Sequence, residues 1–591
     1  MPENKSANTK SGERSKILLL TPLLVLLIAA LGFLVWKNAT TKPLILSAPE
    51  YVDLPETPPP LKTDTPEMES PPLPEEPALP EFNPQAVAST EPSVLISEAD
   101  IMVNGEVVES YETSELIDFT LPEDYANLSG ILTFRGNNFR DSASYGTVSL
   151  HDGKFSQTDK WSVSTGNLQA PDGVVWTGSG WVGQPLMMSW PKEVRANMNM
   201  YDWAKNADTL TEVIYATMDG SIYFIDLETG SKTRDNMYLG FTFKGAGALD
   251  PRGYPILYLG AGYQSNKGAS RAFVINLLDC SVMYEFGHGD SFSLRSSVSF
   301  FDGSPLVDAA TDKLIYPGEN GVLYIIKLNT NYDAQGGLLS IAPSDVIKWR
   351  YKGFRSSGSS YWLGMEDSPV IWRGHIIMAD NGGHLMCLDL NTLQLKWVQD
   401  VLDDTNCTPV LELEDGHPYV YISTSFHGGW RAPTSGTANI PIWKIDAVTG
   451  EIVWQKDYDC YTQEGVSGGT QGTLAIGKNS LSDLIFVPVA RTPGPGNGVL
   501  VALNKQTGSV VWEIVTEAYS WSSPVTIYDN EGKGCLVFCT SGGYMYLIDG
   551  LTGTVMDSLN VGGNVEASPA VYNGTVVVGT RSQTILGVKI V

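Results

Sequence analysis

The sequence predicts an all-β fold, an eight-bladed β-propeller, because two short markers alternate from about residue 180 to the C-terminus. One marker is an Asp/Asn-x-x-Thr-Gly turn that is often followed by Trp, and the other is Ser-Pro-Val or a close variant of it. Short alternating strands between markers that recur roughly every 40 to 60 residues are typical of propeller blades, which bury their faces against neighbouring blades.

The turn marker predicts the end of a hairpin in each blade. Its first residue is Asp226, Asp389, Asp446, Asn504 or Asp549. An Asp or Asn side chain accepts hydrogen bonds from backbone amides about two residues further on, and Gly adopts the positive φ that tight turns require. We therefore interpret these acidic residues as turn formers and not as ligands.

The second marker predicts where each blade begins. It divides the chain at Gly183-Gln184-Pro185, Ala246-Gly247-Ala248, Pro305, Pro369, Pro409, Gly469-Thr470-Gln471, Pro524 and Pro569. The last unit lacks a closing strand, whereas the segment from Trp161 to Gly166 looks like a closing strand without a blade. Pairing the two would close the ring and leave no open sheet edge.

The N-terminal region predicts a membrane anchor and a spacer. We assign residues 1–16 to a cytoplasmic tail, 17–36 to an uncleaved transmembrane signal anchor, 37–93 to a disordered Pro/acidic linker, 94–130 to a small stalk element and 131–591 to the propeller. Ile17 to Trp36 are apolar enough to cross a bilayer, and the lysines and arginine before them favour a cytoplasmic N-terminus. A cleaved signal peptide is the alternative, although its apolar core is typically about 7 to 15 residues long and ends in a small-x-small site that is not obvious here. An Asn-Gly pair between apolar runs predicts a hairpin in the stalk.

The charge balance limits the class of partner. The chain has 66 acidic and 38 basic residues, for a net charge of −28, and no basic stripe that would neutralise phosphates. We therefore expect no nucleic-acid partner. The six cysteines are too few for a disulfide scaffold, and a pairing of Cys407 with Cys460 stays open.

The Asp/Asn-x-x-Thr-Gly-x-x-x-Trp unit resembles the PQQ-like (pyrroloquinoline-quinone) repeat, and the segment TFRGNNFRDSASYG resembles the entry motif that precedes such propellers. The resemblance covers roughly residues 131 to 591. It implies that one Trp per blade packs against the next blade, at Trp349, Trp397, Trp454 and Trp512.

The resemblance leaves three functions open. Quinoprotein dehydrogenases of this family stack the quinone on a disulfide of adjacent cysteines, and no two cysteines are adjacent here, so we predict no enzyme activity and no cofactor. We expect a non-catalytic protein-binding or assembly scaffold outside the membrane of a Gram-positive-type cell envelope, similar to the lipoprotein subunit of the outer-membrane β-barrel assembly machine. A sensory or glycan-binding ectodomain, whose ligand would be cell-wall glycan, and a PQQ-dependent oxidoreductase are the alternatives.

The longest loops predict the binding face. Trp, Tyr and Arg are enriched at binding hot spots, although any one of them could instead plug the central channel. The candidate residues in or beside these loops are Arg295, Arg355, Tyr361, Trp362, Glu366, His427, Trp430, Arg431, Arg491 and Trp521.

Overall fold

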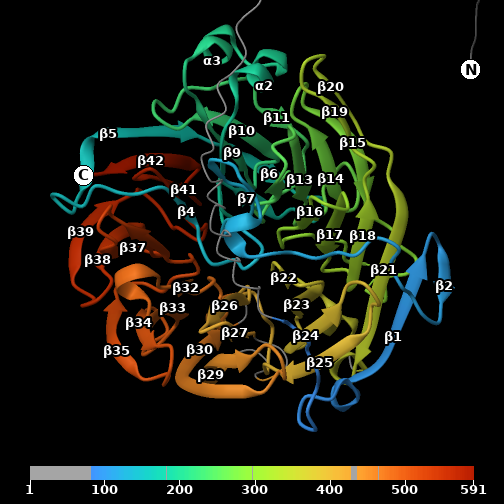
Figure 1. The fold of residues 1–591 in the computed structure, drawn as a ribbon. Helices are drawn as coiled ribbons and strands as arrows, with labels where there is room; N and C mark the ends of the chain where they lie inside the picture. Colours follow the sequence, from blue (N-terminus) through green and yellow to red (C-terminus); the bar gives the residue numbers. More distant parts are fainter. Residues whose placement is uncertain are drawn as a thin grey trace, which may run out of the picture. The chain divides into compact units, whose positions relative to one another are not determined.

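The computed structural model describes residues 81–181, 183–295, 297–357, 359–427, 431, 435–463 and 465–591. Over these residues the sheets form eight blades around a central axis, as Figure 1 shows, which confirms the predicted fold class. The predicted anchor at Ile17 to Trp36 lies outside the described residues. Within the described ranges, no helix combines the length and the apolar character needed to cross a membrane.

The blades are numbered in chain order. Blade 1 contains β8 (Leu186–Ser189), β9 (Thr211–Ala216), β10 (Ser221–Asp226) and β11 (Met237–Tyr238), and blade 2 contains β12 (Ala248–Leu249), β13 (Ile256–Gly260), β14 (Ala272–Asn276) and β15 (Ser281–Phe286). Blade 3 contains β16 (Leu306–Asp308), β17 (Lys313–Pro317), β18 (Val322–Lys327) and β21 (Ser344–Gly353). Blade 4 contains β22 (Val370–Trp372), β23 (His375–Ala379), β24 (His384–Asp389) and β25 (Leu395–Asp400). Blade 5 contains β26 (Val410–Glu414), β27 (His417–Ser423), β29 (Ser435–Asp446) and β30 (Ile452–Gln463). Blade 6 contains β28 (Ser425–Phe426), β31 (Gly468–Gly469), β32 (Ala475–Ile476), β33 (Leu484–Ala490), β34 (Gly498–Asn504) and β35 (Val510–Thr516). Blade 7 contains β36 (Val525–Tyr528), β37 (Gly534–Cys539), β38 (Tyr544–Asp549) and β39 (Val555–Asn560), and blade 8 contains β40 (Ala570–Tyr572), β41 (Thr575–Thr580), β42 (Thr584–Ile590) and β5 (Phe155–Ser164).

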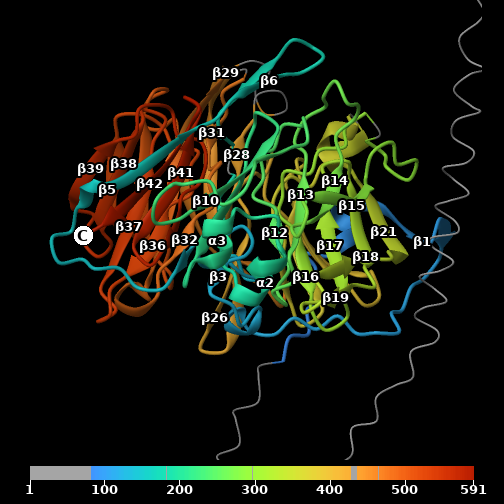
Figure 2. The same cartoon turned by 90° about the horizontal axis from the view of Figure 1, so that it is seen from above.

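The remaining strands and helices lie outside the strands assigned to the eight blades. They are β1 (Ile96–Val103), β2 (Glu106–Val108), β3 (Gly130–Ile131), β4 (Ser144–Tyr145), the hairpins β6 (Asn167–Gln169) with β7 (Val175–Thr177) and β19 (Asn331–Asp333) with β20 (Leu338–Ser340), the helices α2 (Lys192–Asn197) and α3 (Asp202–Asn206), and the short 3₁₀ helices η1 (Pro92–Val94), η2 (Pro122–Asp124), η3 (Arg355–Ser357), η4 (Ser360–Leu363) and η5 (Asn479–Leu481). Figure 2, turned by 90°, shows the hairpin of β6 and β7 projecting at one face.

The ring closes in blade 8, where the two ends of the propeller meet. Strand β42 pairs antiparallel with β5, and Gly587 lies opposite Trp161. The closing strand predicted at Trp161 is therefore confirmed. The pairing gives β42 a partner on its outer side, so the C-terminal sheet has no open edge there.

The turn marker and the tryptophans act together between blades. In the turn that begins at Asp446, the carboxylate accepts from the amides of Val448 and Thr449, and Gly450 has φ +75°. The indole of Trp397 in the preceding blade packs on Gly450, where an added Cβ would lie 2.7 Å from the ring. The same indole donates from Nε1 to the carbonyl of Ala447 at 2.8 Å.

The same arrangement recurs at three other blade junctions. The indole-glycine pairs are Trp161 with Gly230, Trp454 with Gly508, and Trp512 with Gly553. Trp349 departs from it because the next turn has Leu393 in place of Gly, although its ring is 1 % exposed within the same apolar cluster as Leu393.

The entry segment that follows β3 plugs the central channel. Arg140 is completely buried and donates to the carbonyls of Pro369 (2.9 Å) and Ser304 (2.8 Å), which are the marker residues of blades 4 and 3. Arg135 donates in the same way to the carbonyl of Pro524 in blade 7 at 3.0 Å. The two guanidinium groups thus join inner strands that are distant in sequence.

The described residues before the propeller pack against it. Phe82 is 5 % exposed and stacks on Trp372 at 5.0 Å between ring centroids, so packed structure begins within the predicted linker of residues 37–93. The predicted stalk is part of the wall, because β1 pairs with β21 and extends blade 3. Its Asn-Gly hairpin forms as expected, with φ of 50° at Asn104 and 90° at Gly105.

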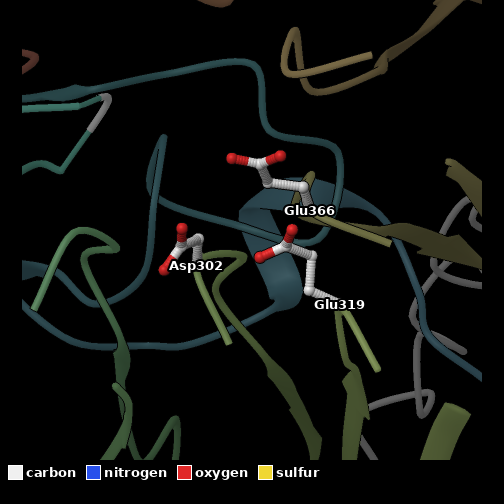
Figure 3. A group of neighbouring side chains, drawn as sticks. All are labelled: Asp302, Glu319 and Glu366. Atoms are coloured by element: carbon white, nitrogen blue, oxygen red, sulfur yellow. The ribbon is translucent and has the colours of Figure 1, made fainter. Parts of the chain in front are cut away.

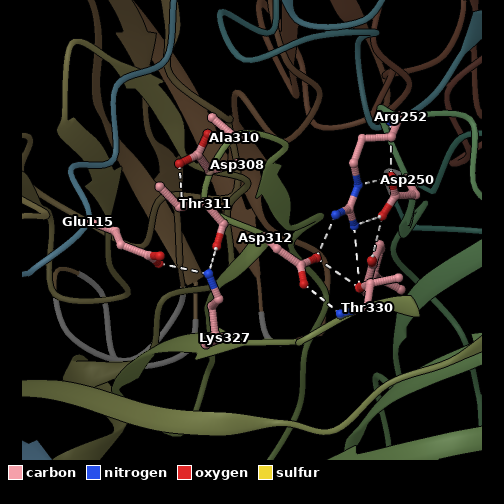
Figure 4. Close-up of polar contacts among 10 residues, drawn as sticks. Glu115, Asp250, Arg252, Asp308, Ala310, Thr311, Asp312, Lys327 and Thr330 are labelled. Atoms are coloured by element: carbon pink, nitrogen blue, oxygen red, sulfur yellow. Dashed lines mark hydrogen bonds and ion pairs between the residues drawn. The ribbon is translucent and has the colours of Figure 1, made fainter. Parts of the chain in front are cut away.

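An ion pair holds the segment before the propeller, through Glu115, to blade 3. In Figure 4, Lys327 donates to the carboxylate of Glu115 at 2.7 Å and to the carbonyl of Thr311 at 2.8 Å. On the other side of the same view, Arg252, between β12 and β13 of blade 2, forms ion pairs with Asp250 (2.6 Å) and with Asp312 of blade 3 (2.7 Å).

All six cysteines are free thiols, so the pairing of Cys407 with Cys460 does not form.

Candidate functional site

The Ser-Pro markers place one side chain from each blade at the same level of the axis. Backbone amides at these markers donate to the hydroxyl of the next blade: Ser304 to Ser368, Ser368 to Thr408, Thr408 to Thr473, Thr473 to Ser523, and Ser523 to Ser568, at 2.8 to 3.2 Å. Equivalent positions in successive blades are therefore held at equivalent heights.

Each blade has one residue that stands three positions before its marker proline, or before the residue that replaces that proline. We call these residues together the axial ring. Its described members are Lys244, Asp302, Glu366, Asn406, Gln471, Trp521 and Glu566. All except Glu366, which is partly exposed, are less than 10 % exposed. The eighth position, Val182, lies outside the described residues. The ring is a buried, mostly polar layer at one mouth of the plugged channel.

An acidic cluster occupies one side of the axial ring. Asp302, Glu319 and Glu366 each offer a carboxylate oxygen within 4.8 Å of the others, and Figure 3 shows the three side chains converging from separate loops. Lys244 donates to Asp302 at 3.1 Å, and Arg295 donates to Glu319 at 3.2 Å. Trp181 donates from Nε1 to Glu366 at 2.9 Å.

The cluster carries more negative than positive charge, and this shifts its titration. Burial, together with the neighbouring Glu319, raises the pKa of Asp302 to about 6 although Lys244 opposes the shift. Burial and the carboxylates of Glu319, Asp404 and Asp302 raise the pKa of Glu366 well above its ordinary value. Burial lowers the pKa of Lys244, but the surrounding carboxylates outweigh burial and leave it raised.

A small cavity lies beneath these carboxylates. It has a volume of about 10 Å³, the size of one water molecule, and its lining includes Asp302, Ser304, Glu366, Asp367 and Asn406. Four buried oxygens of this lining have no hydrogen-bond partner: Asp302 Oδ1, Ser304 Oγ, Asp367 Oδ1 and Asn406 Oδ1. Unpaired buried acceptors cost free energy, so the cavity is suited to a group that donates hydrogen bonds.

Aromatic rings surround the mouth. Tyr361 stacks on His427 at 5.4 Å and meets Trp362 edge-on at 4.8 Å, while the guanidinium of Arg295 lies 4.6 Å above the ring of Tyr361. Across the axis, the ammonium of Lys244 lies 4.5 Å from the ring of Trp181. The mouth therefore already holds two internal cations against aromatic faces.

The structure brings together half of the predicted binding-face residues. Arg295, Tyr361, Trp362, Glu366 and His427 form one contiguous group beside the cluster. Trp521 belongs to the axial ring and contacts Trp181 at 5.9 Å.

The other predicted residues have structural partners or are not described. Arg355 pairs with Asp400 at 2.7 Å, and Arg431 pairs with the buried Asp403 at 2.5 Å. Arg491 is 5 % exposed and lies 5.1 Å from the ring of Tyr461. Trp430 lies outside the described residues.

Sequence reasoning missed Lys244, Asp302, Glu319 and Asn406. A usable signal existed for three of them, because Asp302 and Asn406 stand three residues before a marker proline and Lys244 stands three before Gly247, which replaces that proline in blade 2. Glu319 carries no such signal, since it belongs to the turn between β17 and β18.

Oxygen ligands at this spacing are of the type that bind hard cations such as Ca²⁺, and Asp302, Glu319 and Glu366 are the residues that could hold one. The ammonium of Lys244 already interacts electrostatically with all three carboxylates. A divalent ion bound between them would lie close to this positive charge.

Comparison with protein families gives one match. Residues 332–533 match the PQQ_2 family, described as outer membrane protein assembly factor BamB. No match was found among curated proteins.

Two solved structures align with much of the chain at low sequence identity. BamB from Moraxella catarrhalis is 15 % identical and aligns over 68 % of this chain and 98 % of its own, with a TM-score of 0.44. The quinohemoprotein alcohol dehydrogenase ADHIIG from Pseudomonas putida HK5 is 11 % identical, aligns over 81 % of this chain and 83 % of its own, and has a TM-score of 0.51. The latter likeness shows the shared fold alone.

Proposed function

Since the chain is a β-propeller of the PQQ-like repeat family, we propose that it is a non-catalytic scaffold that captures a protein of the cell envelope at the mouth bearing the axial ring. In this proposal Ile17 to Trp36 anchor the chain in the membrane and the propeller lies outside.

One observation carries the proposal: aromatic and arginine side chains gather at a mouth whose channel is plugged behind them. Tyr361 and Trp362 are partly exposed and belong to the residue types that dominate binding energy at protein interfaces. The buried guanidinium of Arg295 lies 4.6 Å from the ring of Tyr361 and supports it. Because Arg140 and Arg135 tie the entry segment to the inner strands, the channel is closed behind these side chains. A closed surface suits docking better than transport through the ring.

The description of the matched family as an assembly factor supports the same reading. The oxidoreductase alternative needs room for a quinone. The cavity lined by Asp302, Glu366 and Asn406 is about 10 Å³, whereas cofactor pockets typically measure about 300 to 1,000 Å³. This cavity is therefore too small for a quinone.

Site-specific photo-crosslinking in the native envelope tests the proposal. A photoreactive phenylalanine analogue at Trp362, beside the mouth, is expected to yield a discrete protein adduct. The same analogue at Val511, which is 49 % exposed on β35 at the outer rim, is the matched control and is expected to yield none.

The alternatives predict other outcomes of the same experiment. An adduct at position 362 that carries only cell-wall sugar would favour the glycan-binding ectodomain. Stoichiometric binding of PQQ in the presence of Ca²⁺, with dye reduction, would overturn the non-catalytic assignment. Equal protein adducts at both positions would remove this face from consideration.

A further inference from the structure

The cavity beneath the acidic cluster has the electrostatics of a site for a positively charged donor. Four carboxylates that influence one another, those of Asp302, Glu319, Glu366 and Asp404, face two internal cations, Lys244 and Arg295. Burial and mutual repulsion raise the pKa of Glu366 and of Asp404 well above their ordinary values, so a cation that binds here takes the place of protons on these carboxyls. Asp404 is 3 % exposed and its Oδ1 is also without a partner.

The hydrogen-bonding inventory of the cavity specifies the donor further. Three of its unpartnered atoms, Asp302 Oδ1, Asp367 Oδ1 and Asn406 Oδ1, are carboxyl or amide oxygens that accept hydrogen bonds. A water molecule brings two donors and also adds acceptors, whereas a primary ammonium brings three donors, a positive charge and no acceptor. An ammonium is also about the size of the cavity, while a planar guanidinium is larger.

The protein itself shows how this mouth accommodates an ammonium. Lys244 is 6 % exposed, donates to Asp302, and lies 4.5 to 6.0 Å from the ring centroids of Trp181, Trp176, Phe300 and Tyr263.

We propose that the cavity receives the ammonium group of a lysine side chain of the partner protein, which enters past the partly exposed Glu366 and is held by Glu366, Asp302 and Asn406. The inference rests on the proposed function, because it supplies the chemistry by which a docking protein is recognised. Charge complementarity selects the occupant, since Asp302, Glu366 and Asp367 line the cavity and Glu319 lies beside them.

Titration of the full chain with a short peptide tests the chemistry directly. The probe is acetyl-Gly-Gly-Lys-Gly-Gly-amide, and the signal is tryptophan fluorescence. The indole of Trp181 donates a hydrogen bond to Glu366, so binding at Glu366 changes the surroundings of this indole. We expect saturable binding that weakens about 10-fold or more when the lysine is replaced by arginine or by Nε-acetyl-lysine, as loss of a charged hydrogen bond implies.

Variants locate the binding to the cavity. Glu366→Gln and the near-isosteric Asn406→Leu should each weaken the lysine peptide by about 10-fold or more. Glu513→Gln is the control, since Glu513 is an exposed carboxylate on β35 that accepts from Tyr458 at 3.1 Å and does not belong to the axial ring, and it should change affinity by less than about twofold. Thermal unfolding of each variant shows whether it keeps its fold.

Three outcomes would overturn the proposal. These are no saturable binding, equal affinity for the acetylated peptide, and displacement of the peptide by stoichiometric Ca²⁺ with loss of Ca²⁺ binding in Glu366→Gln, which would make the cavity a metal site. If the lysine peptide does not bind while the photoreactive analogue at Trp362 still captures a protein, the proposed lysine site is refuted but the scaffold function is not.

Discussion

Glu366 illustrates how position on the axis changes the chemistry of a single residue. Its carboxyl comes from the loop before β22 and accepts from Trp181, yet it faces three further carboxylates. Burial and this repulsion keep its pKa raised. Because the native state then binds protons more tightly than the unfolded chain, the stability contributed by protonated Glu366 is complete below pH about 4.5 and is lost as pH rises through the folded pKa.

We therefore predict that Glu366→Gln flattens the decline of stability with rising pH. For Asp302, whose pKa is raised to about 6, the decline falls between about pH 4 and 6, and for Glu366 it extends further upward. Chemical denaturation of both proteins from pH 4.5 to 8 provides the measurement. A wild-type stability that rises over this range, or identical slopes, would contradict the assignment.

At the scale of single elements, the turn and the tryptophan of the preceding blade form one unit. The turn carboxylate fixes the backbone, glycine leaves the space, and the indole fills it. Both the positive φ and the 2.7 Å approach at Gly450 exclude a larger residue.

Gly450→Ala should accordingly destabilise the propeller by roughly 2 kcal/mol or more, since about 1 to 2 kcal/mol comes from the left-handed backbone alone and the clash with Trp397 adds to it. Gly562→Ala is the matched control, because Gly562 has φ +84° with nothing within 4 Å of an added Cβ. Urea denaturation compares the two. Equal losses would show that the indole contact contributes nothing.

The plug acts at the level of several elements. Arg140 reaches two blades and is completely buried, so its removal leaves several carbonyls unpaired. We predict that Arg140→Met lowers the free energy of unfolding by at least about 3 kcal/mol.

Arg373→Met serves as its comparison. Arg373 pairs at 3.4 Å with Asp118, whose side chain is 54 % exposed, and such surface pairs contribute about 1 kcal/mol or less. Comparable losses in the two variants, measured by urea denaturation, would argue against a structural role for the plug.

For the whole molecule, closure in blade 8 makes the ring a single cooperative structure. Strand β42 connects β41 to β5, so it carries the only pairing between the C-terminal sheet and the N-terminal closing strand among the described residues. Each blade is held by both of its neighbours once this junction exists.

Deletion of Ile585 to Val591 should remove that junction and abolish the cooperative thermal transition at the wild-type temperature. Differential scanning calorimetry of the full and shortened chains measures the effect. A shortened chain that melts in one transition at an unchanged temperature would refute the role of closure.

Much of the fold could be predicted from the sequence because it depends on local chemistry. The turn at Asp446 involves five consecutive residues, the Asn104-Gly105 hairpin two, and the marker prolines report blade entries one at a time. Even closure followed from local patterns, since an unpaired closing strand and a unit without one are both visible in the chain.

The site was decided by tertiary structure. Trp181 meets Glu366 because the ring brings the entries of blades 1 and 4 to one axis, and Lys244 meets Asp302 because blades 2 and 3 pack side by side. Arg431 looked like a surface contact residue but is paired with Asp403, and Glu319 carried no pattern at all. A repeat determines how each blade folds, whereas the charge at the centre is the sum of one position from every blade, and that sum exists only in the closed ring.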